Sequence, residues 1–217
     1  MKLVLFDMDG TLVDSEALLL ATQVEACRIH GHVHPGRRAG LDVVGLTLDI
    51  ALGRLIGTNK AEPEMSETYK RLFNAMRLDD AHAALAEKLY PGVAEGLAGL
   101  AARDDLVLGI ATGKSHRGYA YMAENHGWAD YFATVQTADI APSKPHPGMI
   151  HQAMRETGIG PGNTFMIGDS NHDMEMAVAA GVTAIGVSWG FQPVDVLTRT
   201  GASHIVREFA DIETLLG

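Results

Sequence analysis

Short apolar runs recur along this chain, and segments with a helical spacing of apolar residues separate the later ones. Runs rich in Val, Ile and Leu and bounded by turn residues are typical of buried β-strands. The predicted strands are 3–6, 106–111, 132–136, 164–168, 183–188 and 204–206. The predicted helices between and after them are 92–103, 116–126, 146–157, 171–180 and 208–215. Because alternating strands and helices form βαβ units, we expect an α/β fold built on a parallel sheet.

The alternation is interrupted between the first and second predicted strands by a segment far longer than a crossover needs. We expect this segment to form a helical cap domain, residues 15–89, inserted into a core of residues 1–14 and 90–217. The two hinges between the domains are expected near 13–16 and 88–92. Within the cap, helices are predicted at 15–31, 47–57 and 66–78, with loops near 32–40 and 57–65.

Polar residues follow four of the predicted strands at the point where each strand ends. They are Asp7 and Asp9 after the first strand, Thr112, Gly113 and Lys114 after the second, Lys144 after the third, and Asp169 and Asp173 after the fourth. In an open parallel sheet the ligand lies beyond the carboxyl ends of the strands. We therefore expect these residues to meet at one edge of the sheet and to form one site.

The negative charges of the acidic residues in this set must be balanced by positive charge. Asp7 and Asp9 stand two positions apart, so their carboxylates repel each other, and Asp169 and Asp173 would add to the negative charge. A divalent cation together with Lys144 would offset most of it. Carboxylate oxygens suit a hard ion, so Mg²⁺ is the expected cofactor, bound by Asp169 directly and by Asp173 directly or through water.

The same residues suit the hydrolysis of a phosphate ester. A carboxylate can attack phosphorus and form an aspartyl-phosphate, and Asp7, in line with the strand, is the expected nucleophile. Asp9 is the expected general acid and base, which protonates the leaving oxygen and later activates water. Thr112 and Gly113 are expected to hold the phosphoryl oxygens, and Lys144 to balance their charge.

The order "DMDGT", "ATGK", "SKPHP" and "GDSNHD" resembles the four motifs of the haloacid dehalogenase-like hydrolases, and the resemblance covers the whole chain. It implies a Rossmann-like core, an inserted helical cap of the C1 type and a Mg²⁺ ion. It also implies that Asp7 is the nucleophile and a metal ligand, and that Asp9 is the acid/base. The metal ligand contributed by Asp9 would be its backbone carbonyl, beside the side chains of Asp169 and Asp173.

Within this family the pattern looks closest to the phosphoglycolate phosphatase-like group, which acts on many small phosphomonoesters. The dehalogenases lack an acid at the position of Asp9, and none of Lys60, Lys70 and Lys88 stands in a context typical of a Schiff-base lysine. A phosphosugar mutase of the β-phosphoglucomutase type stays open, because such enzymes share the four motifs and the cap type. A non-catalytic binding protein that retains the fold is a further alternative.

The other polar residues are expected to have structural roles, or their roles stay open. The role of Lys114 stays open, because its side chain could face either the site or water. His172 is expected to point away from the neighbouring carboxylates, and His146 to shape the Lys144 loop. The remaining candidates are interpreted as exposed loop histidines (His30, His32 and His34) or as cap arginines that could face either a leaving group or water (Arg37, Arg38 and Arg54).

Composition limits the possible partners. The formal charge of −10 argues against a broad nucleic-acid surface but permits a small phosphorylated metabolite in a local basic pocket.

The single cysteine, Cys27, is expected to be buried, which fits a cytoplasmic protein. No signal peptide and no apolar run long enough for a membrane span are apparent. We expect a monomer or a small homo-oligomer.

Overall fold

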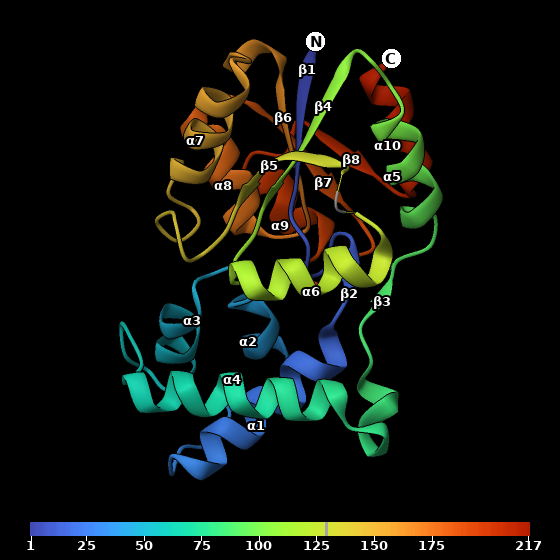
Figure 1. The fold of residues 1–217 in the computed structure, drawn as a ribbon. Coiled ribbons are helices and arrows are strands. Elements are labelled where there is room, and N and C mark those ends of the chain that lie inside the picture. Colours follow the sequence, from blue (N-terminus) through green and yellow to red (C-terminus); the bar gives the residue numbers. More distant parts are fainter. Residues whose placement is uncertain (129) are drawn as a thin grey trace.

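A six-stranded parallel sheet forms the centre of the core, in the order β5-β4-β1-β6-β7-β8. The structure is a computed structural model that describes residues 1–128 and 130–217 (Figure 1). The strands are β1 (Lys2–Phe6), β4 (Leu106–Ala111), β5 (Phe132–Gln136), β6 (Thr164–Gly168), β7 (Thr183–Val187) and β8 (His204–Val206). The predicted α/β fold with a Rossmann-like core is confirmed, and each predicted strand lies within one residue of its observed bounds.

The central position of β1 explains its uninterrupted apolar sequence. Both faces of a central parallel strand are covered, so every side chain from Leu3 to Phe6 is buried. Phe6 pairs in register with Ile110 of β4 and with Ile167 of β6. The residues that follow these three strands therefore emerge side by side at the carboxyl edge of the sheet.

Two helical layers cover the sheet, and alternate residues of β1 contribute to them (Figure 1). Val4 and Phe6 belong to the cluster that includes α5 (Val93–Ala101), α6 (His116–His126) and α10 (Phe209–Leu216). The opposite cluster contains Leu3 and Leu5 and the helices α7 (Gly148–Thr157), α8 (Asn171–Ala180) and α9 (Val194–Arg199). This division follows from the period of two along a strand. In the described part of the chain, no helix has both the length and the apolar character that a membrane span requires.

The predicted cap segment folds into a group of helices beyond the carboxyl edge of the sheet, with both termini at the opposite edge (Figure 1). Its elements are α1 (Glu16–Ile29), α2 (Arg37–Asp42), α3 (Leu48–Leu55), α4 (Pro63–Leu78) and the 3₁₀-helix η1 (Asp80–Leu85). The helices α1, α3 and α4 share a hydrophobic cluster of their own, in which Cys27, Leu52 and Met65 are buried, and Ala39 of α2 packs against it. A short antiparallel ribbon of β2 (Val13–Asp14) and β3 (Lys88–Leu89) connects them to the core.

Several cap elements differ from the prediction. Helix α2 occupies part of the segment predicted as a loop at 32–40, and it buries Gly40 and Leu41. Helix α4 begins at Pro63 and not at residue 66, and a proline is favoured in the first helical turn. The ribbon of β2 and β3 is too short to produce a periodic pattern. In the core, the short helix α9 was not predicted, and α7 begins after Pro147 and not at residue 146.

Candidate active site

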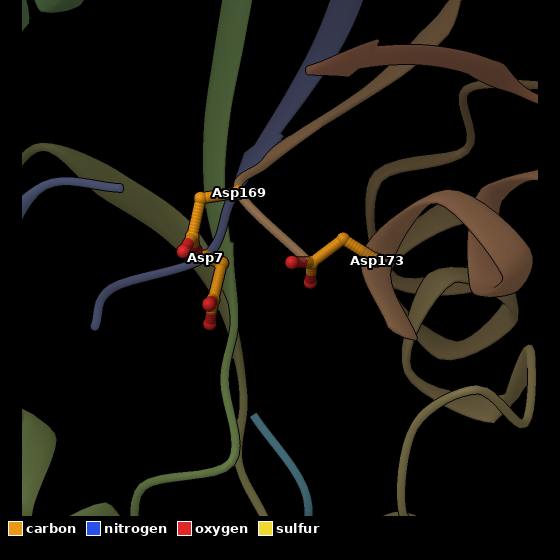
Figure 2. A group of neighbouring side chains, drawn as sticks. All are labelled: Asp7, Asp169 and Asp173. Atoms are coloured by element: carbon orange, nitrogen blue, oxygen red, sulfur yellow. The ribbon is translucent and has the colours of Figure 1, made fainter. Parts of the chain in front are cut away.

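Three buried carboxylates meet at the carboxyl edge of the sheet. Asp7 follows β1, Asp169 follows β6, and Asp173 lies in the first turn of α8. Each offers an oxygen within 4.8 Å of oxygens of the other two, and none is more than 1% exposed. Figure 2 shows the three side chains directed into one space from different segments of the chain. The sequence predicted that these residues meet, and the topology brings them together.

Hydrogen bonds fix Asp169 and Asp173 from the protein side. Asp169 accepts from the Thr11 hydroxyl (3.1 Å) and from the Phe191 backbone N–H (2.8 Å). Asp173 accepts from the hydroxyl (2.6 Å) and the backbone N–H (3.1 Å) of Ser170, in a capping box that starts α8. The N-cap that begins this helix therefore also orients one of the three carboxylates.

Glycines make room for these carboxylates. A Cβ atom at Gly10 would lie 2.2 Å from Asp169 Oδ2, and Gly10 also has a φ of +85°. A Cβ at Gly190 would lie 2.1 Å from Cβ of Asp169, and one at Gly168 would lie 2.3 Å from Cγ of Asp173. The glycines in "DMDGT", "GDSNHD" and "SWGF" are therefore required by the close approach of backbone to acidic side chains.

Lys144 supplies the positive charge at the centre of the cluster. Its side chain is fully buried, and its Nζ lies 2.8 Å from Asp7 Oδ1 and 2.7 Å from Asp173 Oδ1. Burial alone would lower the pKa of Lys144, but Asp173 and Asp7 raise it above its ordinary value. The side chain is therefore an ammonium ion in direct contact with the predicted nucleophile.

One ammonium does not balance three carboxylates. Burial is the main cause that raises the pKa of Asp7 to about 7; Lys144 opposes this rise, and the charges of Asp173 and Asp9 add to it. The pKa of Asp169 is also raised well above its ordinary value, by burial first and then by Asp173 and Asp7. Converging carboxylate oxygens with excess negative charge fit a hard divalent cation, and Mg²⁺ is such an ion.

Asp9 has different partners from the three clustered carboxylates. Its Oδ1 accepts from the Ser15 hydroxyl at 2.5 Å and lies 2.9 Å from Nζ of Lys114. Ser15 immediately precedes α1 and Lys114 follows β4. The Asp9 carboxylate is thus held between the start of the cap segment and the core.

Thr112 and Gly113 follow β4, whose carboxyl end lies beside that of β1. Thr112 is 1% exposed, and its hydroxyl accepts from the backbone N–H of Lys114 at 3.2 Å. A Cβ at Gly113 would lie 2.6 Å from the backbone oxygen of Gly45 in the cap. Gly113 is therefore a position where the backbones of cap and core approach closely.

The side chain of Lys114 faces the protein, which the sequence left undecided. It is 8% exposed and lies between Asp9 and Glu87, with its Nζ 3.0 Å from Glu87 Oε1. Glu87 in turn pairs with Arg77 at 2.6 Å. Sequence analysis missed Glu87 and Arg77, because neither stands in a motif and only the docking of the cap brings them to this place.

A cleft of about 820 Å³ lies between cap and core. Asp9, Gly113 and Lys114 line it from the core, and the helices α1, α3 and α4 with the segment 43–47 line the other side. Its cap residues include Leu19, Gln23, Val43, Leu46, Leu52, Ser66, Tyr69, Phe73, Asn74 and Arg77. A second hollow of about 450 Å³, beside α7, contains none of the predicted site residues.

Other candidates lie away from the carboxylate cluster. Arg37 and Arg38 form exposed ion pairs with Glu16 and Asp42, and His172 contacts the backbone oxygen of Asp42 at 2.9 Å. The prediction of three exposed loop histidines is wrong for two of them. His30 and His34 are half-buried and form hydrogen bonds with Thr68 and Gln23, whereas His32 is exposed.

Comparison with known proteins agrees with this geometry. Residues 4–187 match the family model of the haloacid dehalogenase-like hydrolases. A probable phosphatase, IndB, of Dickeya dadantii is 35% identical over 97% of this chain and 91% of its own. A phosphoglycolate phosphatase of Vibrio vulnificus is 32% identical over 97% of this chain and 94% of its own.

Solved structures show the same fold. A hydrolase from Pseudomonas syringae superposes with a TM-score of 0.84 at 22% identity, covering 100% of this chain and 98% of its own. The segments that carry Asp7, Lys144 and Asp169 lie inside the family match. The chain therefore belongs to the haloacid dehalogenase-like hydrolases and is similar to phosphoglycolate phosphatases of that family.

Proposed function

We propose that this protein is a Mg²⁺-dependent phosphatase that hydrolyses a small phosphomonoester through an aspartyl-phosphate on Asp7. The observation that carries this proposal is the buried contact of the Asp7 carboxylate with Lys144, beside Asp169 and Asp173. Such a site can hold a carboxylate nucleophile in its ionised form only when cations balance its neighbours. Two relatives whose names identify them as phosphatases support the same reaction class.

The reaction would proceed in two displacements at phosphorus. An oxygen of Asp7 attacks phosphorus, the bond from phosphorus to the leaving oxygen breaks, and Asp9 gives a proton to that oxygen. Asp9 then takes a proton from water, whose oxygen attacks the aspartyl-phosphate and releases inorganic phosphate. Asp7 and Asp9 both return to their starting states.

The phosphoryl group would be held by Thr112, Gly113 and Lys144. The Lys144 ammonium is already fixed by Asp7 and Asp173, so it needs little reorganisation to balance the phosphoryl oxygens. Mg²⁺ would be held by Asp7, Asp169, Asp173 and the backbone carbonyl of Asp9. When bound, it would neutralise carboxylates and phosphoryl oxygens and so allow two anions to meet.

We further propose that residues 15–89 act as a cap that determines which leaving group enters. The cleft lies between this segment and Asp9, so its cap side would face the leaving group. The ribbon of β2 and β3 lies at the predicted hinges and would let the cap open and close. The names of two relatives favour phosphoglycolate, and we include sugar phosphates as alternatives. A panel of phosphorylated metabolites, compared by kcat/KM, would identify the substrate.

The first test replaces the nucleophile. In Asp7→Asn the carboxylate cannot form the acyl phosphate, so we expect release of inorganic phosphate to fall by at least about a thousandfold. Asp195→Asn is the matched control, since it makes the same change in an exposed ion pair with Arg199. Phosphate release from 4-nitrophenyl phosphate and from the metabolite panel is measured with and without Mg²⁺. Turnover retained by Asp7→Asn, in a folded protein, would exclude the proposed mechanism.

The alternative within this fold is a phosphosugar mutase. It would use the same Asp7 but transfer the phosphoryl group to a second sugar hydroxyl, and the cleft of about 820 Å³ has room for a sugar phosphate. Conversion of a sugar phosphate to its isomer, without stoichiometric release of phosphate, would identify a mutase. Binding of phosphorylated compounds without either reaction would identify a non-catalytic protein.

A further inference from the structure

Lys114 joins a carboxylate of the core to a carboxylate of the cap segment. Its buried ammonium lies 2.9 Å from Asp9 Oδ1 and 3.0 Å from Glu87 Oε1. The Glu87 side chain is only 4% exposed and stands immediately before β3, where the chain returns from the cap to the core. A lysine side chain has many rotamers, so a second fixed partner is needed to hold it beside Asp9.

Arg77 forms an ion pair with Glu87 from the cap side. Its Nη2 lies 2.6 Å from Glu87 Oε2, and its side chain is 8% exposed. The guanidinium lies 4.5 Å from the ring centre of Phe73 on α4 and 4.4 Å from that of Tyr121 on α6. The planar cation is therefore clamped between an aromatic ring of the cap and one of the core.

Charges of alternating sign thus run from Asp9 through Lys114 and Glu87 to Arg77. Buried ion pairs of this kind gain little net stability, because the desolvation of each charge opposes the attraction. Loss of Glu87, however, leaves Arg77 without its carboxylate partner and leaves Lys114 with Asp9 alone. The arrangement is therefore better suited to fixing the geometry of Asp9 than to stabilising the fold.

We propose that Glu87 and Arg77 are positioning residues that act through Lys114 to hold the Asp9 carboxylate toward the leaving oxygen of the substrate. The inference rests on the proposed function, because it assigns a task to Asp9 in that reaction. It gives the cap segment a part in proton transfer in addition to its part in shaping the cleft. Neither residue touches the phosphoryl group in this scheme.

The leaving group provides a selective readout. In the first displacement the bond between phosphorus and the leaving oxygen breaks, the bond from Asp7 to phosphorus forms, and a proton moves from Asp9 to the leaving oxygen. An alkoxide needs that proton, whereas 4-nitrophenolate is stable enough to leave without it. A misplaced Asp9 should therefore slow alkyl phosphates much more than the aryl phosphate in this step.

The experiment compares Glu87→Gln with wild type in the first turnover, by rapid mixing at saturating substrate and Mg²⁺. The substrates are 4-nitrophenyl phosphate and whichever of the glycolate, glycerol or hexose phosphates the wild type hydrolyses fastest. We expect the first-turnover rate to fall about tenfold more for the alkyl than for the aryl phosphate, with KM changed by less than about threefold. Glu25→Gln, which removes an exposed partner of Arg28, is the matched control and should behave as wild type.

Arg77 provides an independent variant. Arg77→Lys keeps the charge beside Glu87 and should retain most of the alkyl-phosphate rate, whereas Arg77→Met should reproduce the selective loss. If Glu87→Gln does not fold, as judged by circular dichroism and thermal unfolding, the two Arg77 variants test the proposal in its place. A rescue by Lys is not expected if Arg77 contributes only aromatic packing.

The outcomes separate this inference from the proposed function. The positioning role would be overturned by any of three results: equal losses of rate for both substrates, a change in KM alone, or no change in either variant. Each of these results would leave Asp7-dependent hydrolysis intact. A wild type that releases phosphate from no substrate, or an Asp7→Asn variant that retains its rate, would overturn the proposed function and this inference together.

Discussion

At the scale of single residues, the site depends on backbone that approaches carboxylates too closely for any side chain. Gly10 shows this most directly, because a Cβ there would overlap with the Asp169 carboxylate. Its φ of +85° also lies in a region that L-residues rarely adopt. A side chain at position 10 would therefore destabilise the protein for two separate reasons: conformational strain and displacement of Asp169.

These penalties can be separated by paired substitutions. Gly10→Ala should lower the free energy of unfolding by about 1–3 kcal/mol and reduce kcat by about tenfold or more, since Asp169 must move. Gly31→Ala is the control, because Gly31 has a φ of +74° but no atom within 4 Å of a Cβ. It should cost about 1 kcal/mol and leave kcat unchanged. Equal activity of the two variants, measured by phosphate release, would contradict the displacement of Asp169.

At the scale of elements, helix α8 combines a structural and a chemical task. The hydroxyl of Ser170 caps its first turn and at the same time orients Asp173. An N-cap residue is ordinarily exchangeable for another capping residue at little cost. Here loss of the hydroxyl would also remove one of the two hydrogen bonds by which Ser170 holds a carboxylate of the candidate metal site.

Ser170→Ala should therefore have two effects. We expect a loss of about 1 kcal/mol in the free energy of unfolding and a higher Mg²⁺ concentration for half-maximal activity. Glu208→Ala removes a comparable capping box at the start of α10, away from the site, and should show the loss of stability alone. Chemical denaturation and Mg²⁺ titration of activity measure the two effects. An unchanged Mg²⁺ requirement in Ser170→Ala would show that Asp173 keeps its place without the cap.

At the scale of the whole molecule, the buried carboxylates connect stability to pH and to metal. The folded protein without metal binds a proton on Asp7 more tightly than the unfolded chain, because the pKa of Asp7 is raised from 3.8 to about 7. Its contribution to stability is present below about pH 4 and is lost as the pH rises through about 7. Asp169 contributes in the same direction, and the raised pKa of Lys144 places its titration above this window.

The Tm of the metal-free protein should thus fall between pH 5 and pH 8, by an amount corresponding to a few kcal/mol at most. If Mg²⁺ binds the ionised carboxylates as proposed, it should raise Tm more at pH 8 than at pH 5. Calorimetry with EDTA and with Mg²⁺, at both pH values, measures the Tm under each condition. A metal-free Tm that rises across the window, or a Mg²⁺ effect independent of pH, would contradict the assignment.

The parts that the sequence predicted share a physical origin. A buried parallel strand is apolar along its whole length, so β1, β4 and β6 were recognisable, and topology alone then brings Asp7 and Asp169 together. Contacts that depend on how the cap docks leave no such pattern. The partners of Lys114, the short helix α2 and the β2/β3 ribbon therefore emerged only from the three-dimensional structure.

The strand order has a consequence for how the enzyme is made. Asp7, the proposed nucleophile, follows β1, but the strands that pair with β1 are encoded at 106–111 and 164–168. During synthesis this apolar strand stays unpaired while the ribosome produces the whole helical segment. The contacts within the helical segment are closer in sequence. The cluster of Asp7, Asp169 and Asp173 is therefore complete only after the chain has been synthesised as far as α8.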